Sequence, residues 1–192
     1  LTAYLDAKGI EVEKTNDFSI LFLFSLGVTN AKWSTLLHHL LGFKKHYDSN
    51  LSLTEAIPSI AAYYPGLGLK DLGESMMKHL HQNNVMDLQQ KAFAQLPKSD
   101  MIPANAYQKL VANEVERIAL KQASGRTAAT GLVPYPPGIP LVMPGENIGT
   151  LEDPFMPYLL ALETWDKNFP GFAHDTHGIE SEDGVYHLLV IK

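Results

Sequence analysis

The sequence predicts an α/β protein of the α+β kind, with helices packed on a small sheet. Segments with the 3.6-residue period of amphipathic helices occur beside short segments rich in β-branched and aromatic residues. The chain has 192 residues, of which 45% are hydrophobic and 19% charged, a balance typical of globular proteins. It contains no cysteine, so its stability must come from an apolar core, which this length can supply.

The first fifty residues predict a small α-β-β-α layer. Residues 2–8 fit the last turns of a helix that ends at Gly9. Two β-rich segments, Ile10–Glu13 and Phe18–Leu26, follow, separated by the turn-prone residues Lys14–Asp17. The second of them contains the longest apolar run, Ile20–Leu26, which predicts a buried strand.

The clearest helix of the sequence is predicted from Asn30 onward. Its apolar residues recur at intervals of three and four, and a basic Lys44-Lys45-His46 tail suits a helix C-terminus. The periodic positions are Trp33, Leu36, Leu37, Leu40 and Leu41.

A polar break at residues 48–53 predicts a domain boundary, with one domain over residues 1–50 and another over 51–192. In the second domain, helices are predicted first, and a mixture of β segments and helices follows. Helices are predicted over 54–64, 69–82, 85–95, from Pro103, and over 154–165; β segments are predicted over 115–120, 127–133, 141–143 and 185–191.

Composition and charge narrow the range of functions. The net charge is −6, and the only arginines are Arg117 and Arg126, which argues against a nucleic-acid partner and fits a small cationic substrate. A seven-residue apolar run is far short of the ~20 residues that span a bilayer, so no membrane partner is expected. The absence of cysteine excludes thiolate-ligated metals and thiol nucleophiles and is compatible with the cytoplasm. Because the chain begins at Leu1, we expect it to be a piece of a longer one.

Several short motifs are, on their own, weak evidence for a functional site. Ser75–Lys78 has the S-x-x-K pattern of serine acyl-transferases, but its partner motifs are absent and a helix explains it better. Gly66–Asp71 begins like a dinucleotide loop, yet it lacks the third glycine and predicts a turn. His174, Asp175 and His177 have the spacing of metal ligands, but a polar loop is the stronger interpretation, so we predict no metal site.

Glu11 and Glu13 alternate along the first predicted strand, so both side chains would point to the same face. On a cleft wall they would form a small anionic site. From the residues alone, a solvated strand end is the stronger interpretation.

The proline-rich segment Pro134–Glu146, within Thr127–Glu146, is similar to the C-terminal part of the bacterial ornithine/lysine/arginine decarboxylases, large fold-type-I enzymes that use pyridoxal phosphate. The resemblance extends in order along nearly the whole chain. Supporting segments are Gly9–Thr15, Phe22–Gly27, Lys32-Trp33, Phe43–Asp48 and Phe169–Phe172.

This resemblance implies that residues 1–50 end an aminotransferase-like small domain and that residues 51–192 form the decarboxylase C-terminal domain. The family's S-x-H-K lysine and the Asp that holds the pyridinium nitrogen are absent from this sequence. We therefore expect pyridoxal phosphate in the full-length enzyme, and neither cofactor nor catalytic residues nor activity in this chain. The partners implied are the cofactor domain of the same polypeptide, further copies in a homo-oligomer, and a basic amino acid.

In the family's lysine and ornithine members, the Glu of an E-K-T segment contacts the distal ammonium of the substrate, and the matching residue here is Glu13. Tyr135 and Glu146 of the proline-rich segment would line the cleft wall. The Glu13–Thr15 match favours lysine, segments such as Phe22–Trp33 and Trp165–Phe172 place arginine close behind, and ornithine comes third. The alternative is a catalytically passive structural or oligomerisation module, with Glu13 on the surface.

Overall fold

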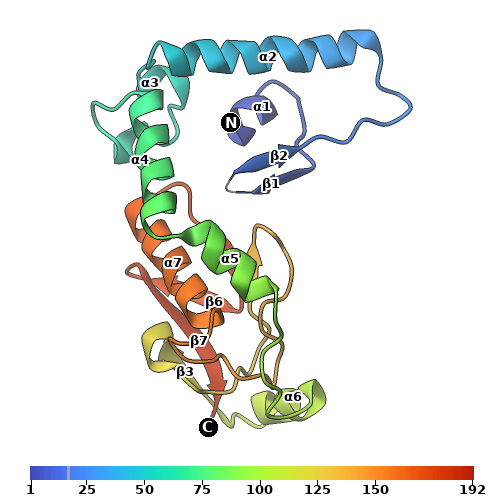
Figure 1. Ribbon diagram of the computed structural model, residues 1–192, viewed down its shortest axis with the longest axis vertical. Coiled ribbons are helices and arrows are strands. Elements are labelled where there is room, and N and C mark those ends of the chain that lie inside the picture. Colours follow the sequence, from blue (N-terminus) through green and yellow to red (C-terminus); the bar gives the residue numbers. More distant parts are fainter. Residues whose placement is uncertain (17) are drawn as a thin grey trace. The chain divides into compact units, whose positions relative to one another are not determined.

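The computed structural model describes residues 1–16 and 18–192, which form two compact units, Leu1–Met77 and Lys78–Lys192 (Figure 1). The first unit extends beyond the boundary predicted at residues 50 and 51. The reason is local, because the Leu69 N–H donates to the Leu51 carbonyl at 2.8 Å and the side chain of Asn50 contacts residues 70 and 71. The assignment of the two segments to family domains stays a prediction.

The first unit opens with the predicted helix, followed by a hairpin whose strands differ from the predicted ones. Helix α1, Thr2–Asp6, is followed by Gly9 in a left-handed conformation, at φ +71°. Strands β1, Lys14–Asn16, and β2, Ser19–Leu21, pair antiparallel, with Thr15 opposite Ile20. The strand predicted at residues 10–13 is not formed, and residues 14–16, predicted as a turn, are β1. Asp17, the rest of that predicted turn, lies outside the described residues.

The prediction of a buried strand at Ile20–Leu26 is wrong. Only its first two residues belong to β2, and large apolar side chains beyond them face solvent: Leu23 is 72% exposed and Phe24 58%. An apolar segment becomes buried only when another surface of the protein packs against it. The first unit does not supply that surface for this segment.

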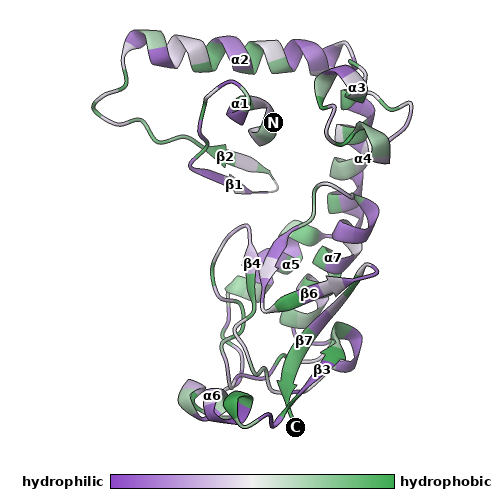
Figure 2. Ribbon diagram, turned by 180° about the vertical axis from the view of Figure 1, so that it is seen from behind, coloured by the Kyte–Doolittle hydropathy of each residue, from purple (hydrophilic) through white to green (hydrophobic). Residues whose placement is uncertain are grey.

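Helix α2, Asn30–Asp48, confirms the predicted helix and has two apolar faces. On one face, the Tyr4 ring lies 5.3 Å from the Phe43 ring, between ring centroids. The other face carries Trp33, Leu37 and Leu41, four residues apart and each 45–58% exposed. We call these three residues the α2 stripe; hydrophobic and hydrophilic turns alternate along this helix in Figure 2.

The helix predicted at residues 54–64 is interrupted. Helix α3, Leu53–Ala56, ends before Pro58, which has no backbone N–H to continue it, and a short 3-10 turn follows at Ala61–Tyr63. Helix α4, Leu69–Gln82, has the predicted bounds. The Asn50 Oδ1 atom caps it by accepting from the N–H groups of Lys70 at 2.9 Å and Asp71 at 3.2 Å.

The second unit is built on a three-stranded antiparallel sheet in the order β3-β7-β6 (Figure 1). Helix α7 packs against α5 and β7, and its apolar residues form much of the core. A separate pair joins β4 and β5. The elements are α5 Val85–Phe93, α6 Pro103–Val111, β3 Val115–Ala119, a 3-10 turn Leu120–Gln122, β4 Val133–Tyr135, α7 Phe155–Asn168, β5 Asp175–His177, β6 Ile179–Glu182 and β7 Val185–Ile191.

The β predictions for this unit are only partly confirmed. β3 and β7 form as predicted, whereas the segments at 127–133 and 141–143 make isolated bridges, such as Leu132 to Val142, in place of continuous strands. β5 and β6 were not predicted, because their sequences are polar and their residues are largely exposed. Over the described part of the chain, no helix is both long enough and apolar enough to cross a bilayer.

Candidate functional site

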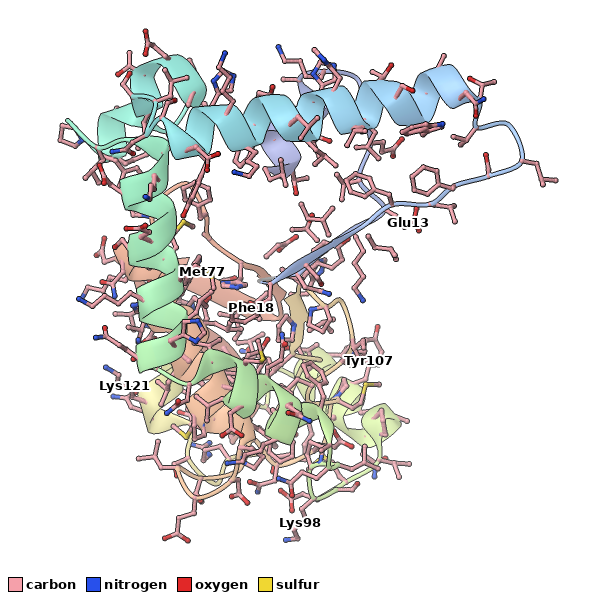
Figure 3. All side chains as sticks on the ribbon, turned by 45° about the horizontal axis from the view of Figure 1, so that its top comes forward. Glu13, Phe18, Met77, Lys98, Tyr107 and Lys121 are labelled. Atoms are coloured by element: carbon pink, nitrogen blue, oxygen red, sulfur yellow. The ribbon has the colours of Figure 1, made fainter. Side chains whose placement is uncertain are left out.

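Glu13 lies in the coil immediately before β1, in the first unit (Figure 3). Its backbone N–H donates to the Leu21 carbonyl at 3.1 Å, which extends the hairpin pairing by one residue. Its carboxylate is exposed and bonds to none of the described residues. Glu11 is exposed too, and because no strand forms at 10–13, the alternation that would align the two side chains does not apply. An exposed carboxylate binds a cation weakly unless a second surface desolvates it.

The proline-rich segment forms a closed loop in the second unit. The Gly138 N–H donates to the Pro134 carbonyl at 2.8 Å, and the Leu141 N–H donates to Leu132 at 2.9 Å. The Glu146 carboxylate accepts the Met143 N–H at 2.7 Å and so closes the turn at residues 143–146. The Glu146 carboxylate therefore stabilises this loop. The side chain of Tyr135, in contrast, is 53% exposed.

The side chain of Asp100 joins two residues that flank this loop in the sequence, Thr127 and Asn147. One carboxylate oxygen accepts the Thr127 hydroxyl and the Asn147 side-chain N–H, each at 2.8 Å. These hydrogen bonds, first that of Asn147 and then that of Thr127, hold the pKa of Asp100 below its ordinary value.

This shift predicts a pH dependence. Because the folded-state pKa is lowered, Asp100 stabilises the fold above the carboxyl's ordinary pKa, and the stabilisation is lost as the pH falls through the lowered value. We expect Asp100→Asn to lower the urea midpoint at pH 7 and to narrow its difference from wild type near pH 3. A gap that stays constant across this pH range would contradict the ionised role.

A buried polar network joins α7 to β7 and to the residue just before β5. The side chains of Asp166 and His174 are 8% and 6% exposed. Asp166 Oδ1 accepts the backbone N–H of His174 at 2.9 Å and lies 2.9 Å from His174 Nδ1, while Asp166 Oδ2 accepts the hydroxyl of Tyr186. Burial first, and then this bond to Asp166, raise the pKa of Tyr186.

The Asp166 network borders a cavity of about 480 Å³, also lined by Thr176 and Asp183. Sequence reasoning assigned His174 to a different set of partners. Asp175 and His177 are 77% and 67% exposed and lie 3.4 Å apart, and neither bonds to Asp166 among the described residues. Within residues 1–16 and 18–192, no three potential ligands converge on a metal position. The signal that sequence reasoning missed is the spacing of eight residues between Asp166 and His174, which a helix followed by a turn brings together.

The other two motifs lie within α4 and at its start. Ser75–Lys78 lies inside α4, where Ser75 and Lys78 are exposed. The turn predicted over Gly66–Asp71 is only partly formed: Gly66, at φ +78°, lies in a turn, whereas Leu69–Asp71 are the first residues of α4. An ideal Cβ on Gly68 would lie 2.1 Å from Asn50 Oδ1, so this glycine serves the capping of α4.

Comparison with known proteins gives concordant results. The sequence model of the family described as "Orn/Lys/Arg decarboxylase, C-terminal domain" matches residues 86–192. The chain is 42% identical to the biodegradative arginine decarboxylase of Escherichia coli K12, over 100% of this chain and 26% of that protein. It is 43% identical to the lysine decarboxylase LdcA of Pseudomonas aeruginosa, over 96% of this chain and 25% of that protein.

A solved structure of lysine decarboxylase A from Pseudomonas aeruginosa superposes with a TM-score of 0.90 at 41% identity, covering 100% of this chain and 27% of that one. The chain thus spans about a quarter of the length of the relatives it matches.

Proposed function

The chain belongs to the Orn/Lys/Arg decarboxylase family, and from this premise we propose that it is the C-terminal part of a pyridoxal-phosphate-dependent enzyme that decarboxylates a basic amino acid. The observation that carries the proposal is the match of the family's C-terminal domain to residues 86–192, together with relatives that are similar along the whole chain. We further propose a cytoplasmic homo-oligomer, in which the cofactor domain of the same polypeptide completes the active site.

Within that enzyme, Glu13 would contact the distal ammonium of the substrate, and Tyr135 and Glu146 would line the cleft wall. The bare carboxylate of Glu13 supports this role, because it bonds to none of the described residues and can accept a cation. Tyr135 supports it as well, since an exposed ring presents a flat apolar surface to a methylene chain. Glu146 contributes through the shape of the loop that its bond to Met143 maintains.

The relatives are named for arginine, lysine and ornithine, with identities from 35% to 43%. We propose lysine as the preferred substrate, because Glu13-Lys14-Thr15 matches the lysine type. Arginine is the nearest competitor. A comparison of kcat/KM for the three amino acids in the full-length enzyme tests this order directly.

The described residues do not fit the cofactor by themselves. When bound, pyridoxal phosphate serves as the electron sink for decarboxylation, and it requires a lysine in a site that excludes water. No lysine described by the structure is buried, and Lys78 of the S-x-x-K segment is exposed. The contribution of this chain is therefore substrate binding and cleft shape.

Because the described residues do not fit pyridoxal phosphate by themselves, the chain alone should neither bind the cofactor nor decarboxylate a substrate. Mixed with pyridoxal phosphate, it should show no internal-aldimine absorbance at ~420 nm and should release no carbon dioxide from lysine, arginine or ornithine. Absorbance spectroscopy and a carbon dioxide release assay check both. Stoichiometric cofactor that borohydride traps on one specific lysine would overturn the prediction.

One observation favours the second candidate, an oligomerisation module. The α2 stripe, Trp33, Leu37 and Leu41, leaves apolar side chains in solvent on one helix face, and Leu23 and Phe24 add to the exposed apolar surface of the same unit.

If the α2 stripe mediates association, the chain should form concentration-dependent oligomers in sedimentation velocity, and Leu37→Glu with Leu41→Glu should shift them to monomer. Leu96→Glu is the matched control, because Leu96 is a leucine 90% exposed in the other unit. Equal effects of the two substitutions, or a monomeric wild-type chain, would rule out the α2 stripe as the interface.

A further inference from the structure

The ring of Tyr135 rests on a glycine of its own loop. An ideal Cβ on Gly138 would lie 2.7 Å from Cδ2 and 2.9 Å from Cε2 of Tyr135, closer than real side chains allow. The absence of a Cβ at this position is therefore what lets the ring lie against the backbone.

Hydrogen bonds and prolines restrain the loop backbone that the ring contacts. The Gly138 N–H donates to the Pro134 carbonyl at 2.8 Å, and Gly138 has φ +76°, a conformation that favours glycine. The backbone of Tyr135 is also restrained, because β4 pairs with β5 and Tyr135 lies opposite Asp175. The flanking residues Pro136 and Pro137 each have a fixed φ, which further limits the loop.

The Tyr135 side chain nevertheless remains 53% exposed, and its hydroxyl bonds to none of the residues that the structure describes. A half-exposed tyrosine without a backing surface would populate several rotamers, at an entropic cost on binding. Here the glycine backbone lies against the Cδ2–Cε2 edge of the ring and limits its movement, while about half of the side chain stays accessible. This arrangement pre-orients an aromatic surface for a ligand.

We propose that Gly138 is a positioning residue, which holds one edge of the Tyr135 ring so that the exposed part of the ring meets the methylene chain of a basic amino acid. The inference rests on the proposed function for the identity of that ligand. The orientation of Tyr135 by Gly138 rests on the loop geometry alone.

The test uses a pair of glycines that differ in one respect. Gly138 and Gly125 both have positive φ, at +76° and +71°, but a Cβ on Gly125 would meet nothing within 4 Å. Gly138→Ala and Gly125→Ala therefore share the backbone strain, and only the first displaces the tyrosine ring.

The first measurement is NMR of the chain labelled with ¹³C-tyrosine, with the Tyr135 signal assigned through Tyr135→Phe. We expect Gly138→Ala to move that signal and Gly125→Ala to leave it in place. A Tyr135 signal that is unchanged in Gly138→Ala would overturn the inference and would leave the decarboxylase proposal untouched.

The second measurement is kinetics of the full-length enzyme. We expect Gly138→Ala to raise KM for lysine about tenfold, with a smaller change in kcat, and Gly125→Ala to stay within about twofold. In a Tyr135→Ala background, Gly138→Ala should add nothing further. Full additivity there, or equal KM values for the two glycine variants, would overturn the positioning role. A wild-type enzyme that decarboxylates no basic amino acid would instead refute the proposed function, and the NMR result would still stand.

Discussion

Glu13→Gln should lower kcat/KM for lysine by roughly ten- to a few-hundredfold in the full-length enzyme. The substitution keeps the size of the side chain and most of its hydrogen-bonding capacity, but it removes the charge that would pair with the distal ammonium. A charge-assisted hydrogen bond contributes about 1.5–3 kcal/mol, and each factor of ten in rate corresponds to ~1.4 kcal/mol. Because the Glu13 carboxylate bonds to none of residues 1–16 and 18–192, the substitution removes no partner among them at the same time.

Glu11→Gln is the matched control, because Glu11 is also exposed and lies two residues away without a match to the E-K-T segment. It should cost much less. Cofactor absorbance should persist in both variants, since neither residue is proposed to contact the ring. If Glu13→Gln stays within twofold of wild type, or if it abolishes cofactor binding, the distal contact is wrong and the structural-module alternative is preferred.

The second large effect is on stability. Asp166→Ala removes the acceptor for the backbone N–H of His174 and for the hydroxyl of Tyr186, a residue only 2% exposed. Each stranded buried donor costs about 1–3 kcal/mol, so we expect a loss of roughly 2–5 kcal/mol in the free energy of unfolding. Urea unfolding of the chain, followed by circular dichroism, measures it.

Asp175→Ala provides the comparison for this loss. Asp175 is 77% exposed and its carboxylate lies 3.4 Å from His177, which is itself 67% exposed, so its substitution should change stability by about 0.5 kcal/mol or less. If Asp166→Ala were no more costly than Asp175→Ala, the Asp166 network would not hold α7 to the strands.

Prediction from sequence succeeded where a single helix or strand carries a complete hydrophobic pattern. The apolar spacing of α2, α4 and α7 predicted these helices, and the mostly apolar residues 185–191 predicted a strand, which is β7. It failed for β6, whose residues Ile179–Glu182 are mostly polar and pair only because β7 lies beside them. Tertiary pairing of this kind leaves no local signal.

The site was less predictable than the fold. The physics of the residues left Glu13 as a solvated strand end, and its exposure agrees with that view of this chain alone. Only the family resemblance assigns it a substrate, because the desolvating surface is not among the described residues. The Asp166–His174 pair was missed because two residues eight apart meet only after α7 ends and the chain turns back.

The central position of β7 bears on how the protein is made. β3 and β6 both pair with β7 and not with each other, and β7, Val185–Ile191, is synthesised after both of them. A ribosome that stalls before Val185 therefore leaves both outer strands without their partner, however much of the unit has already emerged. Nascent chains that lack β7 should therefore be substrates for chaperones and proteases, because the two outer strands then expose unpaired edges.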